Sequence, residues 1–198
     1  MKLDWVLAGL HPSVPLLPGI RRQPADLCEV DLFTSTIEID RLTDMVRSQA
    51  DAARIPGDLP WLLEEGAWEM CDNALTHAQW LGGGVLAAQL YRLRGEIEYA
   101  VGDAGVGVLE SLRPAYPMVA DDAAAIIKAR EYGVTRFGQD RRGAGLSETV
   151  DQVMTLDGRV VIRSGRATVT FQVSGMSSSI SEHPWTGTLV KVVVPLPR

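Results

Sequence analysis

Asp103 combines an ionisable side chain with a position that the sequence predicts to be buried. In residues 96–101 the apolar side chains Ile97, Tyr99 and Val101 alternate with Glu or Ala. Such alternation in a β-strand places every second side chain on one face, and continuing the period puts Asp103 on the apolar face. A buried carboxylate is costly unless hydrogen bonds reach it. We therefore expect Asp103 either to be paired with a donor of the protein or to accept a hydrogen bond from a ligand.

A second pattern indicates an anion site. The string Arg141-Arg142-Gly143-Ala144-Gly145 is cationic and glycine-rich, and we expect a helix to begin near Leu146. Backbone N–H groups at the amino end of a helix bind anions, and neighbouring cations strengthen that preference. For the glycines alone, an ordinary helix start is the competing interpretation.

A third segment carries polar residues at steps of four, namely Glu65, Glu69, Asn73 and His77. On a helix this spacing aligns the side chains in a nearly straight row along one side. The plain interpretation is a solvated helix face, so the row acquires a functional meaning only from its context.

Periodicity predicts the elements that carry these residues. Residues 1–28 are proline-rich and without a clear period, so we expect a lead-in segment there and one domain over 29–198. We expect helices at 39–53, 58–81 and 121–132, and strands at 29–37, 85–93, 96–101, 159–163, 167–173 and 188–194. The stretch 174–184 is predicted to be a loose linker. Residues 108–142 are long for a connection, which is typical of a lid.

The three patterns occur in a fixed order. They are Glu69-Met-Cys-Asp-Asn73 on a helix, Asp103-Ala-Gly105-Val-Gly107 after a strand, and Gly143-Ala-Gly145-Leu146 opening a helix. In this order, and with matching secondary structure, they resemble the N, G1 and G2 boxes of the histidine-kinase-like (GHKL, Bergerat-fold) ATP-binding superfamily. Thr186-Gly187-Thr188 and the strand after it also look like the last strand of that family. The resemblance covers about residues 29–197.

The resemblance implies a role for each box in binding ATP and Mg²⁺. Asn73 matches the family's Mg²⁺ ligand, and Glu69, one helical turn earlier, matches the base that orients or deprotonates the attacking water or hydroxyl. Asp103 matches the acid that accepts a hydrogen bond from the amino group of adenine. The remaining matched positions turn the chain beneath the base or close on the phosphates: Gly105, Gly107, Gly143, Gly145 and Leu146.

Other matched residues have an ordinary alternative that stays open. His77 matches a position that is often histidine in the family, but a packed or solvated histidine is the commoner case. Thr188 reaches the base through its hydroxyl or a water, or is only a strand-favouring residue. The arginines of the lid either contact phosphates or belong to a solvated basic loop: Arg136, Arg141 and Arg142.

Composition limits the classes of function. The chain has 198 residues, 46% hydrophobic and 22% charged, which suits one domain with one core. With 25 Asp plus Glu against 19 Lys plus Arg, the net charge of −6 opposes binding to nucleic acid. Two cysteines without a CxxC spacing favour neither a disulfide framework nor a zinc site. The chain shows neither a signal peptide nor an apolar run near the ~20 residues of a membrane span, so we expect a cytoplasmic protein without a membrane partner.

The resemblance implies an α+β fold, a two-layer α/β sandwich in which helices cover one face of a mixed, mostly antiparallel sheet. Sensor kinases and topoisomerases need further segments that this length leaves no room for, so the chain looks most like stand-alone anti-sigma-factor serine kinases. The first hypothesis is a Mg-ATP-binding regulatory protein, a serine/threonine kinase or slow ATPase that acts on a separate protein partner. The alternative is a non-catalytic module that senses ATP or ADP and whose lid switches partner binding. Relatives form dimers, so a homodimer is also open.

Overall fold

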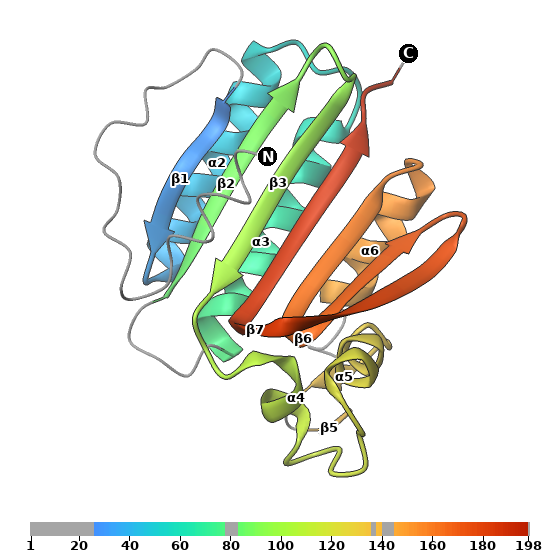
Figure 1. Cartoon of the computed structure of the whole chain (residues 1–198). Coiled ribbons are helices and arrows are strands. Elements are labelled where there is room, and N and C mark those ends of the chain that lie inside the picture. Colours follow the sequence, from blue (N-terminus) through green and yellow to red (C-terminus); the bar gives the residue numbers. More distant parts are fainter. Residues whose placement is uncertain (1–25, 78–82, 136–137, 140–144, 198) are drawn as a thin grey trace.

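The computed structural model describes residues 26–77, 83–135, 138–139 and 145–197 (Figure 1). Its elements, in chain order, are β1 (Asp26–Phe33), α2 (Thr36–Ala52), α3 (Leu59–His77), β2 (Gly84–Tyr91), β3 (Glu96–Asp103), α4 (Gly107–Leu112), α5 (Asp122–Ala129), β4 (Val134–Thr135), β5 (Gly138–Gln139), α6 (Gly145–Thr155), β6 (Arg159–Gln172) and β7 (Gly175–Pro195).

Five strands form one sheet in the order β1-β2-β3-β7-β6, and β4 pairs with β5 separately. Helices α2, α3 and α6 lie against the same face of the large sheet (Figure 1). This confirms the predicted α+β class and is compatible with a two-layer α/β sandwich. Each pairing between described strands is antiparallel, so the expectation of a mixed sheet is wrong.

The core lies between the sheet and the helices, on the faces that periodicity predicts. Helix α2 buries Leu42 and Val46 completely, and α3 buries Ala67 and Met70 against the same cluster. Burying such apolar faces is the main favourable contribution to folding. No helix in the described ranges is both long and apolar enough to cross a membrane.

The first strand ends earlier than predicted, at Phe33 rather than near residue 37. Ser35 caps α2, because its Oγ accepts a hydrogen bond from the N–H of Glu38 (3.3 Å) while the Glu38 carboxylate accepts one from the N–H of Thr34 (2.6 Å). This reciprocal cap starts the helix at Thr36. The predicted lead-in is shorter as well, since β1 begins at Asp26; residues 1–25 lie outside the described part of the chain.

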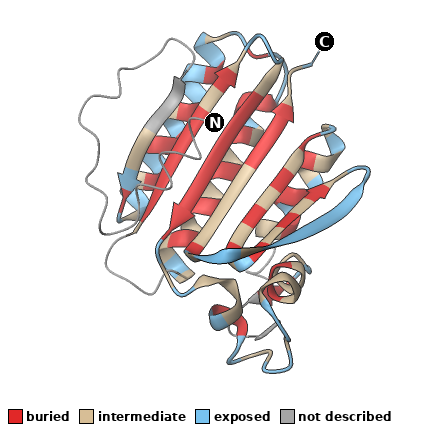
Figure 2. Ribbon diagram, viewed as in Figure 1, coloured by how far each residue is buried: buried red, intermediate tan, exposed pale blue. Residues whose placement is uncertain are grey.

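The last fifth of the chain, residues 159–195, forms one long hairpin instead of three strands and a linker. Strand β6 runs unbroken from Arg159 to Gln172, and residues 175–180 of β7 pair with it. The predicted loose linker at 174–184 is therefore wrong. The serine-rich part of this segment is exposed (Figure 2), so its sequence shows no apolar alternation. Backbone hydrogen bonds to β6 hold it in the sheet instead.

The predicted lid contains two helices. The expected helix at 121–132 is α5, and Asp121 caps it by accepting a hydrogen bond from the N–H of Ala124 (2.8 Å). The sequence did not indicate the six-residue helix α4, which follows β3 directly and is too short to show a period.

Gly66 lets α3 pack closely on β3, and its replacement by alanine tests that packing. A Cβ at Gly66 would lie 2.5 Å from Oη of Tyr99, whose side chain is almost fully buried. We expect Gly66→Ala to destabilise the fold by about 1–3 kcal/mol in urea unfolding, despite the better helix propensity of alanine. Adding Tyr99→Phe removes the atom in conflict and should recover part of the loss. A Gly66→Ala protein as stable as the wild type would contradict this packing.

Candidate functional site

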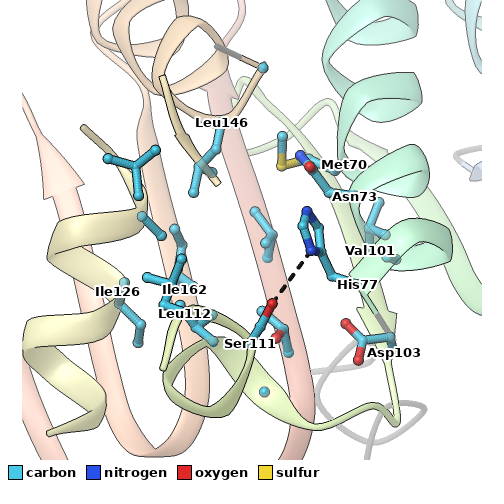
Figure 3. A pocket seen from close by; sticks show the side chains of 18 residues that line it. Met70, Asn73, His77, Val101, Asp103, Ser111, Leu112, Ile126, Leu146 and Ile162 are labelled. Atoms are coloured by element: carbon cyan, nitrogen blue, oxygen red, sulfur yellow. Dashed lines mark hydrogen bonds between the residues drawn. The ribbon is translucent and has the colours of Figure 1, made fainter. Parts of the chain in front are cut away.

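A cavity of about 140 Å³ lies where the ends of several elements meet (Figure 3). Its walls come from α3, β3, α4, α5, β4, α6, β6 and β7. Seven residues predicted from the sequence line it: Asn73, His77, Asp103, Gly107, Gly145, Leu146 and Thr188. The fold thus brings parts of all three sequence patterns to one cavity.

Asp103 lies in the wall of this cavity at the end of β3, and its side chain is buried as the strand period predicts. Its Oδ1 accepts a hydrogen bond from the N–H of Gly105 (2.7 Å), and the backbone of Thr188 also donates to the carboxyl group. Burial raises the pKa of Asp103 to about 6, although both backbone donors act to lower it. The acid therefore has protein donors and also faces space that a ligand can enter.

The raised pKa predicts a pH dependence of ligand binding. Below a pH of about 6 the free protein protonates Asp103, and a neutral carboxyl group is a weaker acceptor than a carboxylate. Affinity for a ligand that donates a hydrogen bond to this group should therefore fall about tenfold between pH 7 and pH 5. Calorimetric titration with ADP across that range measures the effect, and the dependence should disappear in Asp103→Asn. Equal wild-type affinity at both pH values would contradict the role of the carboxylate.

Only part of the polar row of α3 lines the cavity. Asn73 and His77 line the cavity, so that end of the row is not a purely solvated face. The Nδ1 atom of His77 lies 3.4 Å from Oγ of Ser111 on α4, which joins α4 to α3 across the cavity (Figure 3). Glu69, one turn earlier, is not part of the lining.

Glu69 instead lies against the first residue of α6. A Cβ placed on Gly145 would collide with the Glu69 carboxylate, so glycine there lets the helix start approach the acid. Burial is the main cause that raises the pKa of Glu69, and the negative charges of Asp72, Glu148 and Glu65 raise it further. A carboxylate with a raised pKa beside the cavity is a stronger proton acceptor than an ordinary glutamate.

The rest of the wall is largely apolar. Leu112, Ile126 and Ile162 lie close together on the side opposite α3 (Figure 3), and Val134 and Val190 also line the cavity. Such a wall with a few polar groups is typical of a small-molecule site. The sequence interpretation missed Ser111 and Leu112 because it had no helix at 107–112. It predicted the helix that carries Ile126, but not that this side chain lines the cavity.

The remaining predicted residues differ in what the structure says of them. Gly105 is not in the cavity wall and contributes its N–H to Asp103. Helix α6 begins at Gly145, which confirms the predicted helix start. Four positions of the predicted phosphate-binding loop lie outside the described residues: Arg136, Arg141, Arg142 and Gly143.

Among the described residues, no three His, Cys, Asp or Glu side chains are gathered as a metal site. Asn73 nonetheless lines the cavity and carries a side-chain oxygen. Mg²⁺ in proteins often takes one or two oxygen ligands from the chain and completes its shell with water and phosphate oxygens. No protein-family model matches the chain, and no curated protein sequence matches it significantly.

Proposed function

We propose that this protein binds Mg-ATP in the manner of the histidine-kinase-like (GHKL, Bergerat-fold) superfamily, and that it is a regulatory serine/threonine kinase acting on a separate protein partner. The observation that carries the proposal is the buried Asp103 in the wall of a largely apolar cavity that Asn73 and the start of α6 also line. Burial raises the pKa of Asp103 and opposes its ionisation, so the fold gains no stability from this acid at neutral pH. A role in ligand binding explains why the acid lies in the cavity wall together with Asn73 and the start of α6.

Each wall of the cavity suits one part of the nucleotide. The Asp103 carboxylate accepts a hydrogen bond from the exocyclic amino group of adenine, and the apolar wall with Leu112 and Ile162 packs against the base. The amino end of α6 at Gly145 favours the phosphates. Asn73 would hold Mg²⁺, which when bound neutralises phosphate charge.

The proposed reaction depends on Glu69 and the proposed regulation on the lid. Glu69 lies one turn from Asn73 and accepts the proton of the attacking hydroxyl. The lid helices contribute residues to the cavity, and the segments that follow them expose Met118 (92%) and Tyr132 (64%) as apolar contacts for a partner. The non-catalytic alternative uses the same cavity and the same lid surface without phosphoryl transfer.

Calorimetric titration of the whole chain with ATP and ADP, with and without Mg²⁺, tests the proposal. We expect Asn73→Ala to weaken Mg-ADP binding by about tenfold or more while Mg-free ADP binds as in the wild type, because only the metal contact is lost. Thr76→Ala on the exposed side of the same helix is the matched control and should change neither affinity. A wild-type protein that binds neither nucleotide would overturn the proposed function.

Incubation with Mg-ATP labelled on its terminal phosphate, together with candidate partner proteins, separates the two alternatives. Label on a seryl or threonyl residue of a partner supports the kinase. Tight nucleotide binding without transfer or release of phosphate supports the sensing module.

A further inference from the structure

Ser164 joins two segments that are distant in the sequence through a single buried hydroxyl. It lies on β6 and is 1% exposed. Its Oγ accepts a hydrogen bond from the N–H of Val108 in α4 (2.9 Å) and donates one to the carbonyl oxygen of Gly187 on β7 (3.0 Å). A hydroxyl makes both bonds at once. This bridge ties the first turn of the lid to the strand that carries Thr188.

The bridge ends directly beside Asp103. Gly187 has a φ of +81°, and a Cβ there would collide with the backbone oxygen of Asp103 and lie 2.8 Å from its Oδ1. Only glycine permits this approach in that conformation. The next residue, Thr188, gives its backbone N–H to the Asp103 carboxyl group. The placement of Gly187 by Ser164 therefore influences the geometry around the acid.

The two residues after Ser164 attach the second lid helix. The pairing of β6 with β7 shifts register between Ser164 and Ala167, and the extra residues lie on β7, because Ser164, Gly165 and Ala167 pair with Thr188, Trp185 and Ile180. On β6, the N–H of Arg166 donates a hydrogen bond to Oδ2 of Asp122 (2.9 Å), and Gly165 packs its Cα against the same carboxylate. Helix α5, which begins at Asp122, is thus tied to the same short segment of β6 as α4, residues 164–166.

We propose that residues 164–166 of β6, at this register shift, anchor the lid, and that Ser164 is a positioning residue for nucleotide binding. The proposal rests on the proposed function, because the ligand it invokes is the adenine nucleotide. Ser164 does not line the cavity; it acts through Val108, which does, and through Gly187 beside Thr188. A ligand that contacts both β7 and α4 stabilises the bridge between them, so binding orders the lid and its exposed Met118 and Tyr132.

Hydrogen exchange of the whole chain, read by mass spectrometry with and without Mg-ADP, tests the anchor. In Ser164→Ala the amides of Gly107–Leu112 should exchange about tenfold faster without ligand, and Mg-ADP should bind about tenfold more weakly, because Val108 and Gly187 each lose a partner. Ser164→Thr keeps the hydroxyl and should restore both. Ser178→Ala removes the same group from an exposed position of β7 and is the matched control.

Asp122→Ala serves as a second variant, independent of whether Ser164→Ala folds. It should speed exchange in α5 about tenfold while β2 and β3 keep wild-type protection. Wild-type exchange in both α4 of Ser164→Ala and α5 of Asp122→Ala would overturn the anchor, even where the wild type binds Mg-ADP well. Failure of the wild type to bind nucleotide would instead overturn the proposed function and, with it, the ligand coupling. A loss of ADP affinity in Ser164→Ala that Ser164→Thr does not rescue would overturn the role of the hydroxyl.

Discussion

Asparagine at position 103 is expected to weaken adenine-nucleotide binding up to about a hundredfold, which is the upper range for losing a hydrogen bond to a charged acceptor. The carboxylate has two acceptor oxygens, and the backbone N–H groups of Gly105 and Thr188 use part of that capacity. An amide of the same shape replaces one acceptor oxygen by a donor. Calorimetric titration of Asp103→Asn with ADP at pH 7.5 measures the loss.

The same substitution is expected to stabilise the free protein at neutral pH. Because the pKa of Asp103 is about 6 in the folded chain against an ordinary 3.8, its favourable contribution is complete below pH 3.8 and is lost as the pH rises through 6. At neutral pH its ionisation therefore costs the folded state roughly 2–3 kcal/mol, which Asp103→Asn avoids. We expect the variant to be more stable than the wild type by about 1–2 kcal/mol in urea at pH 7.5, with the difference gone near pH 4.

Opposite effects on binding and stability distinguish a functional acid from a structural one. A residue retained for folding loses stability when it is replaced, whereas a strained binding group gains it. Asp44→Asn, on the exposed side of α2, controls for the change of charge and should alter neither quantity. If Asp103→Asn unfolds more easily at pH 7.5 and binds ADP normally, the acid is part of the scaffold and the proposed site is wrong.

The parts of this fold that the sequence predicts are those in which one face is buried locally. Leu42 and Val46 in α2 repeat with the helical period because that face packs on the sheet. In β3 the alternating apolar residues Ile97, Tyr99 and Val101 join the main core cluster, and Asp103 continues their face into the cavity wall. The sequence did not indicate that the opposite face of β3, with Glu98 and Ala100, is buried as well.

The parts that the sequence does not predict depend on distant partners. Residues 175–180 expose their side chains, so no hydrophobic pattern marks them, and only their pairing with β6 makes them a strand. Ser111 and Ser164 are unremarkable serines until the fold brings them to His77 and Val108, which are 34 and 56 residues away. Local propensity carries no information on such contacts.

Glutamine at position 69 is expected to lower phosphoryl transfer or ATP turnover by about 10²–10⁴-fold, the usual contribution of a positioned general base. Nucleotide affinity should change little, because Glu69 lies against Gly145 and is not part of the cavity lining. Because the pKa of Glu69 is raised, this side chain becomes protonated at a higher pH than an ordinary glutamate. Turnover by the wild type should therefore fall at acid pH, and the residual activity of Glu69→Gln should not show this fall.

Glu65→Gln is the matched control, since it makes the same change one turn earlier on the same row of α3. Its carboxylate acts on Glu69 only through charge, so its replacement should shift the acid limb of the pH profile to lower pH and leave maximal turnover near the wild-type value. Turnover by Glu69→Gln at the wild-type rate would show that another group accepts the proton. If the wild-type protein binds Mg-ATP tightly and never turns it over, Glu69 is not a general base. The raised pKa of Glu69 would then result only from its burial near Asp72, Glu148 and Glu65, and the protein would be a nucleotide sensor.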